Sequence, residues 1–190
     1  QFFRLHQDLF RGRKHFYDVG VVRTTATMNN NCLGAHENVY PVEETLLCEK
    51  IPMGIVFDGN IDRISGYKVL VLAEQRALSD DWLEALKKFA EGGGGIVFTG
   101  GTGAFDGWYR PRKGGDPEHG LAPFFDEVPE KTRRRQFGRG KVIYLPRLSV
   151  PYEFDISDWP FYPMNKILPL KNRKTFMNAV RWAAGEPFTV

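Results

Sequence analysis

Five short apolar segments constrain the fold of this chain more than any other feature of its sequence. They cover residues 18–23, 53–58, 68–73, 95–99 and 141–146, and their apolar residues follow one another instead of alternating with polar ones. A strand that is buried on both faces has this pattern, whereas a strand of a sandwich alternates. Because helical stretches lie between several of these segments, the sequence predicts one mainly parallel sheet with helices on both faces.

Three stretches with helical periodicity are expected to cover this sheet. Residues 36–50 have apolar residues on one face, and Pro41 is expected at the start of that helix. Ser79 has the properties of an N-cap, and the glycines at 92–95 end the helix that it begins. The last helix is expected over residues 172–184.

The length of the chain suits a single domain over residues 1–190. These residues, 42% of them hydrophobic, are enough for one sizeable core. Residues 1–16 start with an amphipathic stretch from Phe2 to Phe10, which we interpret as a linker helix that follows a preceding domain. The sequence begins with Gln1 instead of Met, and we interpret it as a piece of a longer protein.

The composition narrows the class of protein. No apolar run approaches the roughly 18 residues of a membrane-spanning helix, so we expect a soluble protein without a membrane partner. The two cysteines, Cys32 and Cys48, have neither the number of a disulfide framework nor the spacing of a metal site. They favour a reducing compartment such as the cytoplasm. We expect no metal and no cofactor.

A basic hairpin is predicted at one edge of the sheet. Residues 133–137 and 141–145 are joined by residues 138–140, and six positive charges lie between Lys131 and Lys141. Such charge suits a polyanion site, and it also protects an edge strand from pairing with other sheets. The formal net charge of the whole chain is only +3, which favours a solvated or intersubunit hairpin and no nucleic-acid partner.

Taken in order, several segments resemble the trimerisation domain of family forty-two β-galactosidases. They are Phe2–Phe10, Asp18–Val22, Gly66–Leu72, Leu78–Trp82, Phe89–Gly93, Ile96–Gly100 and Gly138–Leu145. The resemblance implies a flavodoxin-like, doubly wound α/β fold of the class I glutamine amidotransferase type, with the antiparallel hairpin at one edge. It also implies a place after a catalytic (β/α) barrel, and partners that are other copies of the chain (a homo-oligomer) or other domains of the parent.

The chemistry of the class I amidotransferases can be tested on the sequence. It needs a thiolate on a tight turn between a strand and a helix, with a histidine later in the chain as its base. The matching turn, residues 100–103, has no cysteine, and no histidine follows His119. We therefore expect this segment to have no glutaminase activity and not to be an enzyme. Thr102 with His119 or Asp106 as its base is the alternative, and glycines that permit a sharp turn are the simpler explanation.

Polar residues follow the predicted strands at their carboxyl ends, where open α/β sheets bind ligands. Their mixture of carboxylates, guanidinium groups and aromatic rings is compatible with carbohydrate recognition. The same groups also serve to cap strands, to pair with one another or to contact a neighbouring domain. The candidate ligand-binding residues are Arg23, Asp58, Glu74, Thr102, Asp106, Trp108 and Arg147.

An aromatic loop with three prolines lies between residues 151 and 163. Prolines reduce the entropy that a loop loses when it is ordered, and surface aromatic residues concentrate binding energy. The loop therefore suits an interface, although aromatic residues that fold back on the helices would explain it equally well. The candidate interface residues are Tyr152, Phe154, Trp159, Phe161 and Tyr162.

Three functions follow from these observations. The first, implied by the resemblance, is a non-catalytic accessory domain that oligomerises a carbohydrate-active enzyme and walls a neighbouring subunit's active site. The second is a small-ligand module that binds a sugar at the carboxyl edge of the sheet. The third is a hydrolase with an unrecognised nucleophile, which would need a catalytic pair within hydrogen-bond reach at that edge.

Overall fold

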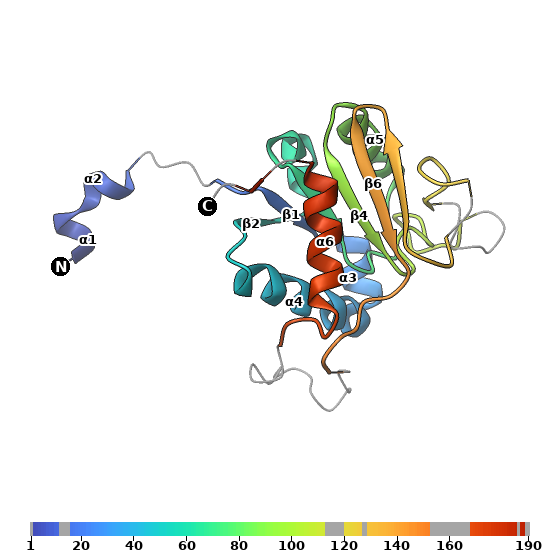
Figure 1. Ribbon diagram of the computed structural model, residues 1–190, viewed down its shortest axis with the longest axis horizontal. Helices are drawn as coiled ribbons and strands as arrows, with labels where there is room; N and C mark the ends of the chain where they lie inside the picture. Colours follow the sequence, from blue (N-terminus) through green and yellow to red (C-terminus); the bar gives the residue numbers. More distant parts are fainter. Residues whose placement is uncertain are drawn as a thin grey trace.

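A six-stranded sheet forms the centre of the computed structural model, which describes residues 2–11, 16–112, 120–126, 129–152, 168–185 and 187–188 (Figure 1). The strand order is β2-β1-β3-β4-β6-β5, and every neighbouring pair is parallel except β5 and β6. The predicted mainly parallel sheet and the antiparallel edge hairpin are therefore confirmed. The strands are β1 (Val19–Val22), β2 (Met53–Val56), β3 (Val69–Leu72), β4 (Gly95–Thr99), β5 (Arg133–Phe137) and β6 (Gly140–Leu145).

Helices cover both faces of this sheet. Helices α4 (Cys32–Cys48) and α6 (Arg173–Ala184) lie on the front face in Figure 1, and α5 (Asp80–Glu91) lies behind it. A 3₁₀ helix, η1 (Asp58–Gly66), follows β2 and packs with α5 on the rear face. The arrangement is a three-layer α/β fold, as the alternation of strands and helices predicts.

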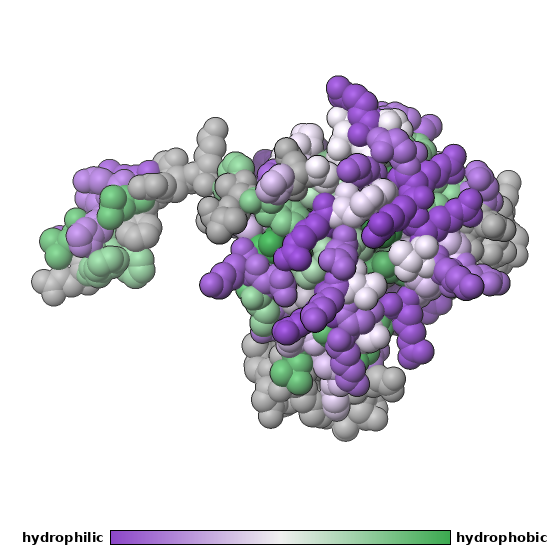
Figure 2. All heavy atoms as spheres, in the orientation of Figure 1, coloured by the Kyte–Doolittle hydropathy of each residue, from purple (hydrophilic) through white to green (hydrophobic). Residues whose placement is uncertain are grey.

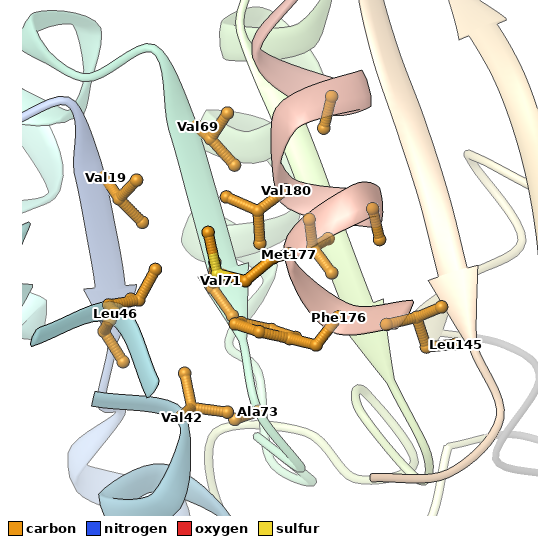
Figure 3. Packing of buried hydrophobic residues seen from close by; sticks show 14 of the residues in the cluster. Val19, Val42, Leu46, Val69, Val71, Ala73, Leu145, Phe176, Met177 and Val180 are labelled. Atoms are coloured by element: carbon orange, nitrogen blue, oxygen red, sulfur yellow. The ribbon is translucent and has the colours of Figure 1, made fainter. Parts of the chain in front are cut away.

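The side chains of each central strand divide between two hydrophobic layers. Val69 and Val71 of β3 belong to the layer under α4 and α6, while Leu70 and Leu72 belong to the layer under α5. Figure 3 shows the first layer, where Phe176 of α6 extends across the sheet toward Val71. Both layers exclude water from the strands, which explains why their apolar residues run without interruption.

The predicted ends of the helices hold for α5 and α6. The Ser79 hydroxyl accepts a hydrogen bond from the backbone N–H of Trp82 at 3.2 Å, so Ser79 is the N-cap of α5. Helix α5 ends at Glu91, directly before the run of glycines. Helix α6 ends at Ala184 and is followed by its C-cap Gly185, whose φ of 72° is the left-handed conformation that glycine adopts most readily.

The prediction for the helix around Pro41 is wrong at its beginning. Helix α4 starts at Cys32, so Pro41 lies inside the helix and not at its first turn. The physical reason is burial: Ala35, Val39, Val42 and Leu46 follow helical spacing on both sides of the proline, and all four are fully buried. Packing of this continuous apolar stripe outweighs the cost of a proline within the helix.

A short helix that the sequence pattern does not predict follows β1. Helix α3 covers Thr25–Asn30, and its N-cap Thr24 accepts a hydrogen bond from the backbone N–H of Thr27. The carboxylate of Asp58 accepts a second bond, from the backbone N–H of Thr25 at 2.8 Å. A partner far away in the sequence therefore stabilises this helix, and the local pattern contains no sign of it.

Two short helices at the amino terminus lie away from the rest of the molecule in Figure 1. They are α1 (Phe2–Leu5) and α2 (Gln7–Phe10), with a break at His6. Phe2, Phe3, Leu5 and Leu9 are all more than half exposed. The interpretation of residues 1–16 as a linker helix stays a prediction. Among the helices of the described ranges, none has both the length and the apolarity needed to cross a membrane.

Candidate functional site

The candidate residues at the carboxyl edge of the sheet fall into separate environments. Arg23, which follows β1, forms a buried ion pair with Glu43 of α4, with N–O distances of 2.6 to 3.0 Å to both carboxylate oxygens. The two side chains are 13% and 12% exposed. Burial raises the pKa of Glu43 even though the Arg23 guanidinium acts in the opposite direction. Arg23 therefore links β1 to α4 and has little surface left for a ligand.

Thr102 lies inside the fold. Its side chain is almost fully buried, and its hydroxyl donates to the backbone carbonyls of Thr99 at 2.6 Å and Leu72 at 3.1 Å. This hydroxyl ties the turn after β4 to the neighbouring strand β3. The position gives a substrate no access to the Thr102 oxygen. His119, the proposed base, lies outside the described residues.

Glu74 organises the turn that would carry the nucleophile of an amidotransferase. Its Oε2 accepts a hydrogen bond from the backbone N–H of Gly101 at 3.0 Å. Glu74 and Gly100 both have left-handed backbone conformations, with φ of 51° and 48°. Burial raises the pKa of the Glu74 carboxyl, with the Gly101 N–H and Arg76 acting in the opposite direction. The turn is thus built around a partly buried acid.

Glu74 also lines a hollow of about 700 Å³ that is bordered by α4 and by the chain between β6 and α6. Arg147, which follows β6, and Lys171, which precedes α6, lie on the same hollow, together with Glu37 of α4. Two carboxylates and two cations thus face one space. The charges nearly balance, so the hollow has no clear preference for an anion or a cation.

Asp58 and Trp108 line a second hollow, of about 480 Å³. Asp58 is fixed there by two donors, because its Oδ1 accepts from the indole N–H of Trp82 at 2.5 Å and its Oδ2 accepts from the N–H of Thr25. Trp108 is 82% exposed and is the most exposed large apolar side chain among the described residues. The side chain of Asp58 is thus held in a fixed position in the lining of the hollow, and Trp108 lies at its exposed edge.

Asp106 holds the loop that presents Trp108. One carboxylate oxygen accepts from the backbone N–H groups of Trp108 and Arg110, each at 2.9 Å, and the other accepts from the Arg110 guanidinium at 2.9 Å. These bonds lower the pKa of Asp106, and the bond from the Arg110 backbone contributes most. Asp106 is therefore engaged within its own loop.

Residues that sequence reasoning missed complete the second hollow. Asn29 and Asn30 of α3 and Asp81 of α5 line it, and all three side chains are exposed. Asn29 and Asn30 are the last two residues of α3, and Asp81 is in the first turn of α5. Both helices follow strands at the carboxyl edge of the sheet, which is the region where ligands bind in open α/β sheets. Asp81 belongs to the acidic first turn of α5, where a carboxylate stabilises the helix dipole, and the same residue lines the hollow.

The predicted interface loop lies mostly outside the described residues. Of its five aromatic candidates, only Tyr152 is described, and it is half-buried. Phe154, Trp159, Phe161 and Tyr162 fall within residues 153–167, of which nothing is described.

The basic hairpin is anchored to the domain by its own cations. Arg134 lies 5.1 Å from the ring centroid of Trp182, and Lys141 lies 5.6 Å from the same centroid. Arg135 donates to the carbonyl of Phe124 at 2.9 Å on the other face. Part of the positive charge therefore holds the edge hairpin against the fold. In the part of the chain that the structure describes, no group of three His, Cys, Asp or Glu side chains is arranged to hold a metal ion.

Comparison with known proteins gives the same fold in part of several enzymes. No protein-family model matches the sequence, and no curated protein matches it either. Among solved structures, the chain is similar to a β-galactosidase from Bacillus circulans sp. alkalophilus, with a TM-score of 0.59 and 14% identity over 73% of this chain and 30% of that chain.

Two further structures extend this likeness. A catalytic mutant of Gan42B, a GH42 β-galactosidase from G. stearothermophilus, gives a TM-score of 0.56 and 16% identity over 73% of this chain and 28% of that chain. A GH42 exo-carrageenase from Bacteroides ovatus gives 0.53 and 16% identity over 71% of this chain and 16% of that one. The chain spans less than a third of the length of each enzyme, and these likenesses establish the fold alone.

Proposed function

We propose that this chain is a non-catalytic accessory domain of a glycoside hydrolase and that its role is self-association. The observation that carries the proposal is the likeness of about 70% of the chain to one part of GH42 enzymes. The strand order β2-β1-β3-β4-β6 supports the flavodoxin-like fold that the resemblance to the trimerisation domain implies. The same arrangement supports the relationship to class I amidotransferases.

The turn after β4 supports a role without amidotransferase chemistry. Gly100 has the left-handed backbone that a nucleophile would adopt on such a strained turn, but it has no side chain. The carboxylate of Glu74 lies where that side chain would be. Within the turn, the only hydroxyl is that of Thr102, and it is bonded to backbone carbonyls inside the fold.

The two edges of the sheet differ in a way that suggests the surface for self-association. Edge strand β5 exposes Arg133, Arg134 and Arg135, a charge pattern that resists pairing with another sheet. Edge strand β2, in contrast, is followed by Phe57 and contains Ile55, which are 46% and 39% exposed. In Figure 2 the face over α6 and the β5–β6 hairpin is mainly hydrophilic, and several hydrophobic residues are visible on the β2 side.

We infer that the β2 edge, meaning Ile55, Phe57 and the exposed Leu47 at the end of α4, contacts a second copy of the chain. An open edge strand offers unpaired backbone groups, and apolar side chains beside it would add buried area. Leu47 is 57% exposed. Exposed apolar residues on α1 and α2 suit contact with a further domain of the parent, in agreement with the interpretation of that segment as a linker.

The test uses the full-length parent and its mass in solution, measured by light scattering. The double variant Ile55→Lys with Phe57→Lys is expected to reduce the oligomer to a smaller species, because interface anchors contribute about 2 kcal/mol or more each. Leu168→Lys is the comparison variant, since Leu168 is 50% exposed, precedes α6 and is not one of the β2-edge residues. Trp159→Ala with Phe161→Ala tests the predicted interface loop separately.

The outcomes are distinct. A smaller mass for the β2-edge variant, with an unchanged mass for Leu168→Lys, supports the proposal. A parent that is monomeric, or an oligomer that none of these variants changes, contradicts self-association as the role of this domain.

A further inference from the structure

The Trp108 loop, residues 105–111, is a rigid platform. Its ends are bridged, because Phe105 pairs with both Ala77 and Pro111. Within it, the backbone N–H of Asp106 donates to the carbonyl of Arg110 at 2.9 Å, and the side chain of Asp106 accepts from three donors of the loop. This many bonds in seven residues fix the position of the Trp108 backbone.

The platform includes a strained residue that serves the placement of Trp108. Tyr109 has a φ of 59°, a left-handed conformation that residues other than glycine rarely adopt. Its ring stacks on that of Phe105, with centroids 4.4 Å apart and planes 3° from parallel, and the Arg76 guanidinium lies 5.2 Å from the Phe105 centroid. Strain of this kind persists where surrounding structure fixes it, and it concentrates at functional sites.

Trp108 is nevertheless exposed, and it borders a concave space. The hollow of about 480 Å³ lies between α3, the start of η1, the start of α5 and the Trp108 loop. Its size falls within the range of small-molecule sites. Most of the Trp108 indole is in contact with water, and removal of such an apolar surface from water is favourable. A ligand that covers the indole would therefore gain free energy of binding.

The lining of the hollow defines the chemistry of that ligand. Amide and carboxylate groups of Asn29, Asn30 and Asp81 offer hydrogen-bond donors and acceptors, and no Lys or Arg lines the space. An anion is therefore disfavoured. A metal cation is not favoured either, because both oxygens of Asp58 already accept protein N–H groups and Asp81 is the one other carboxylate among the described residues of the lining. A neutral ligand with several hydroxyl groups and one apolar face fits best.

We propose that this hollow binds a neutral saccharide, with the C–H face of a pyranose ring against the indole of Trp108. Hydroxyl groups of the sugar bond to the side chains of Asn29 and Asp81. A polypeptide partner fits less well, since Trp108 is the only exposed large apolar residue among those that line the hollow, whereas a protein interface needs a broader apolar centre. This saccharide site is independent of the proposed self-association.

The test is a titration of the 190-residue chain with methyl β-galactopyranoside and with methyl β-glucopyranoside, followed by nuclear magnetic resonance. The chain has four tryptophans, each with one indole N–H signal, so the site can be identified directly. The indole signal of Trp108 is expected to shift as sugar is added. Trp108→Ala should weaken binding by about tenfold or more, as loss of a central anchor does, while Trp108→Phe should retain part of it.

Trp182→Phe is the matched control, because Trp182 is a partly exposed tryptophan on α6 that lies beneath the basic hairpin. It should leave sugar binding unchanged. Unshifted Trp108 signals with both sugars, or equal binding by Trp108→Ala, would overturn the proposal. So would a Trp108→Ala variant that binds sugar normally but changes the mass of the parent, which would assign Trp108 to a protein contact. If Trp108→Ala loses sugar binding and the mass of the parent does not change, the saccharide site is supported independently of self-association.

Discussion

The carboxylate of Glu74 fills the space that a side chain on Gly100 would need. A β-carbon built on Gly100 would lie far inside van der Waals contact with Oε1 of Glu74. Glu74 comes from the end of β3 and Gly100 from the end of β4, which are neighbouring parallel strands. The hydroxyl of Tyr144, on the next strand, donates to the carbonyl of Gly100 at 3.0 Å. Three strands thus meet at a turn whose shape requires glycine.

Gly100→Ala is expected to destabilise the protein by about 3 kcal/mol or more. The left-handed backbone costs a non-glycine residue about 1–2 kcal/mol, and the clash with Glu74 adds to it. Adding Glu74→Ala should relieve the clash and leave the backbone cost. Urea unfolding measures both variants, with Gly59→Ala as the control, since a β-carbon there meets open space. Equal stability of Gly100→Ala and Gly59→Ala would contradict this account of the turn.

Glu74 should make stability depend on pH. Because burial raises its pKa, the folded state holds the proton more tightly than the unfolded chain, whose Glu pKa is about 4.3. This contribution is present below that value and is lost as the pH rises through the raised pKa of the folded state. Glu74→Gln cannot ionise, so its stability relative to the natural protein should increase with pH over this window. Parallel pH curves for the two proteins, measured by urea unfolding, would show that Glu74 does not titrate as proposed.

The ion pair between Arg23 and Glu43 should contribute more to the free energy of unfolding than an ion pair on the surface does. Both side chains are largely buried, so Arg23→Met leaves an unpaired carboxylate and should cost about 3 kcal/mol. The double variant Arg23→Met with Glu43→Leu removes both charges and should recover much of that loss. A double-mutant cycle by chemical denaturation gives the coupling. The exposed pair of Lys88 and Glu84 is the control, where Lys88→Met should change stability by less than about 1 kcal/mol.

The strands were predictable because their environment is uniform. The central strands β1, β3 and β4 are buried on both faces, so the pattern within Val69–Leu72 or Gly95–Thr99 is sufficient to identify them. The N-cap at Ser79 was equally local, since the donor is three residues away. Short-range chemistry therefore accounts for the parts of the fold that the sequence predicts well.

The candidate site was less predictable, because its arrangement depends on pairs that are distant in sequence. All seven candidate residues lie beyond strand ends. The side chain of Arg23, however, pairs with Glu43, and the carboxylate of Asp58 accepts a hydrogen bond from Trp82, which lies 24 residues later in the sequence. A sequence pattern identifies which edge a residue reaches and gives no partner for its side chain. The residues consequently divide between two hollows and several structural contacts.

Pro41 provides a test of why the helix prediction was wrong. If the helix began at Pro41, replacement by alanine would change the stability little. A backbone N–H in the first turn has no partner within the helix, so its absence in proline costs nothing there. Within α4, Pro41→Ala restores a donor to the helix and gains up to about 3 kcal/mol in helix propensity. Pro41 is buried, so the smaller side chain gives back about 1 kcal/mol of packing. We expect a net stabilisation of about 1–2 kcal/mol in urea unfolding, and an unchanged midpoint would favour a helix that starts at the proline.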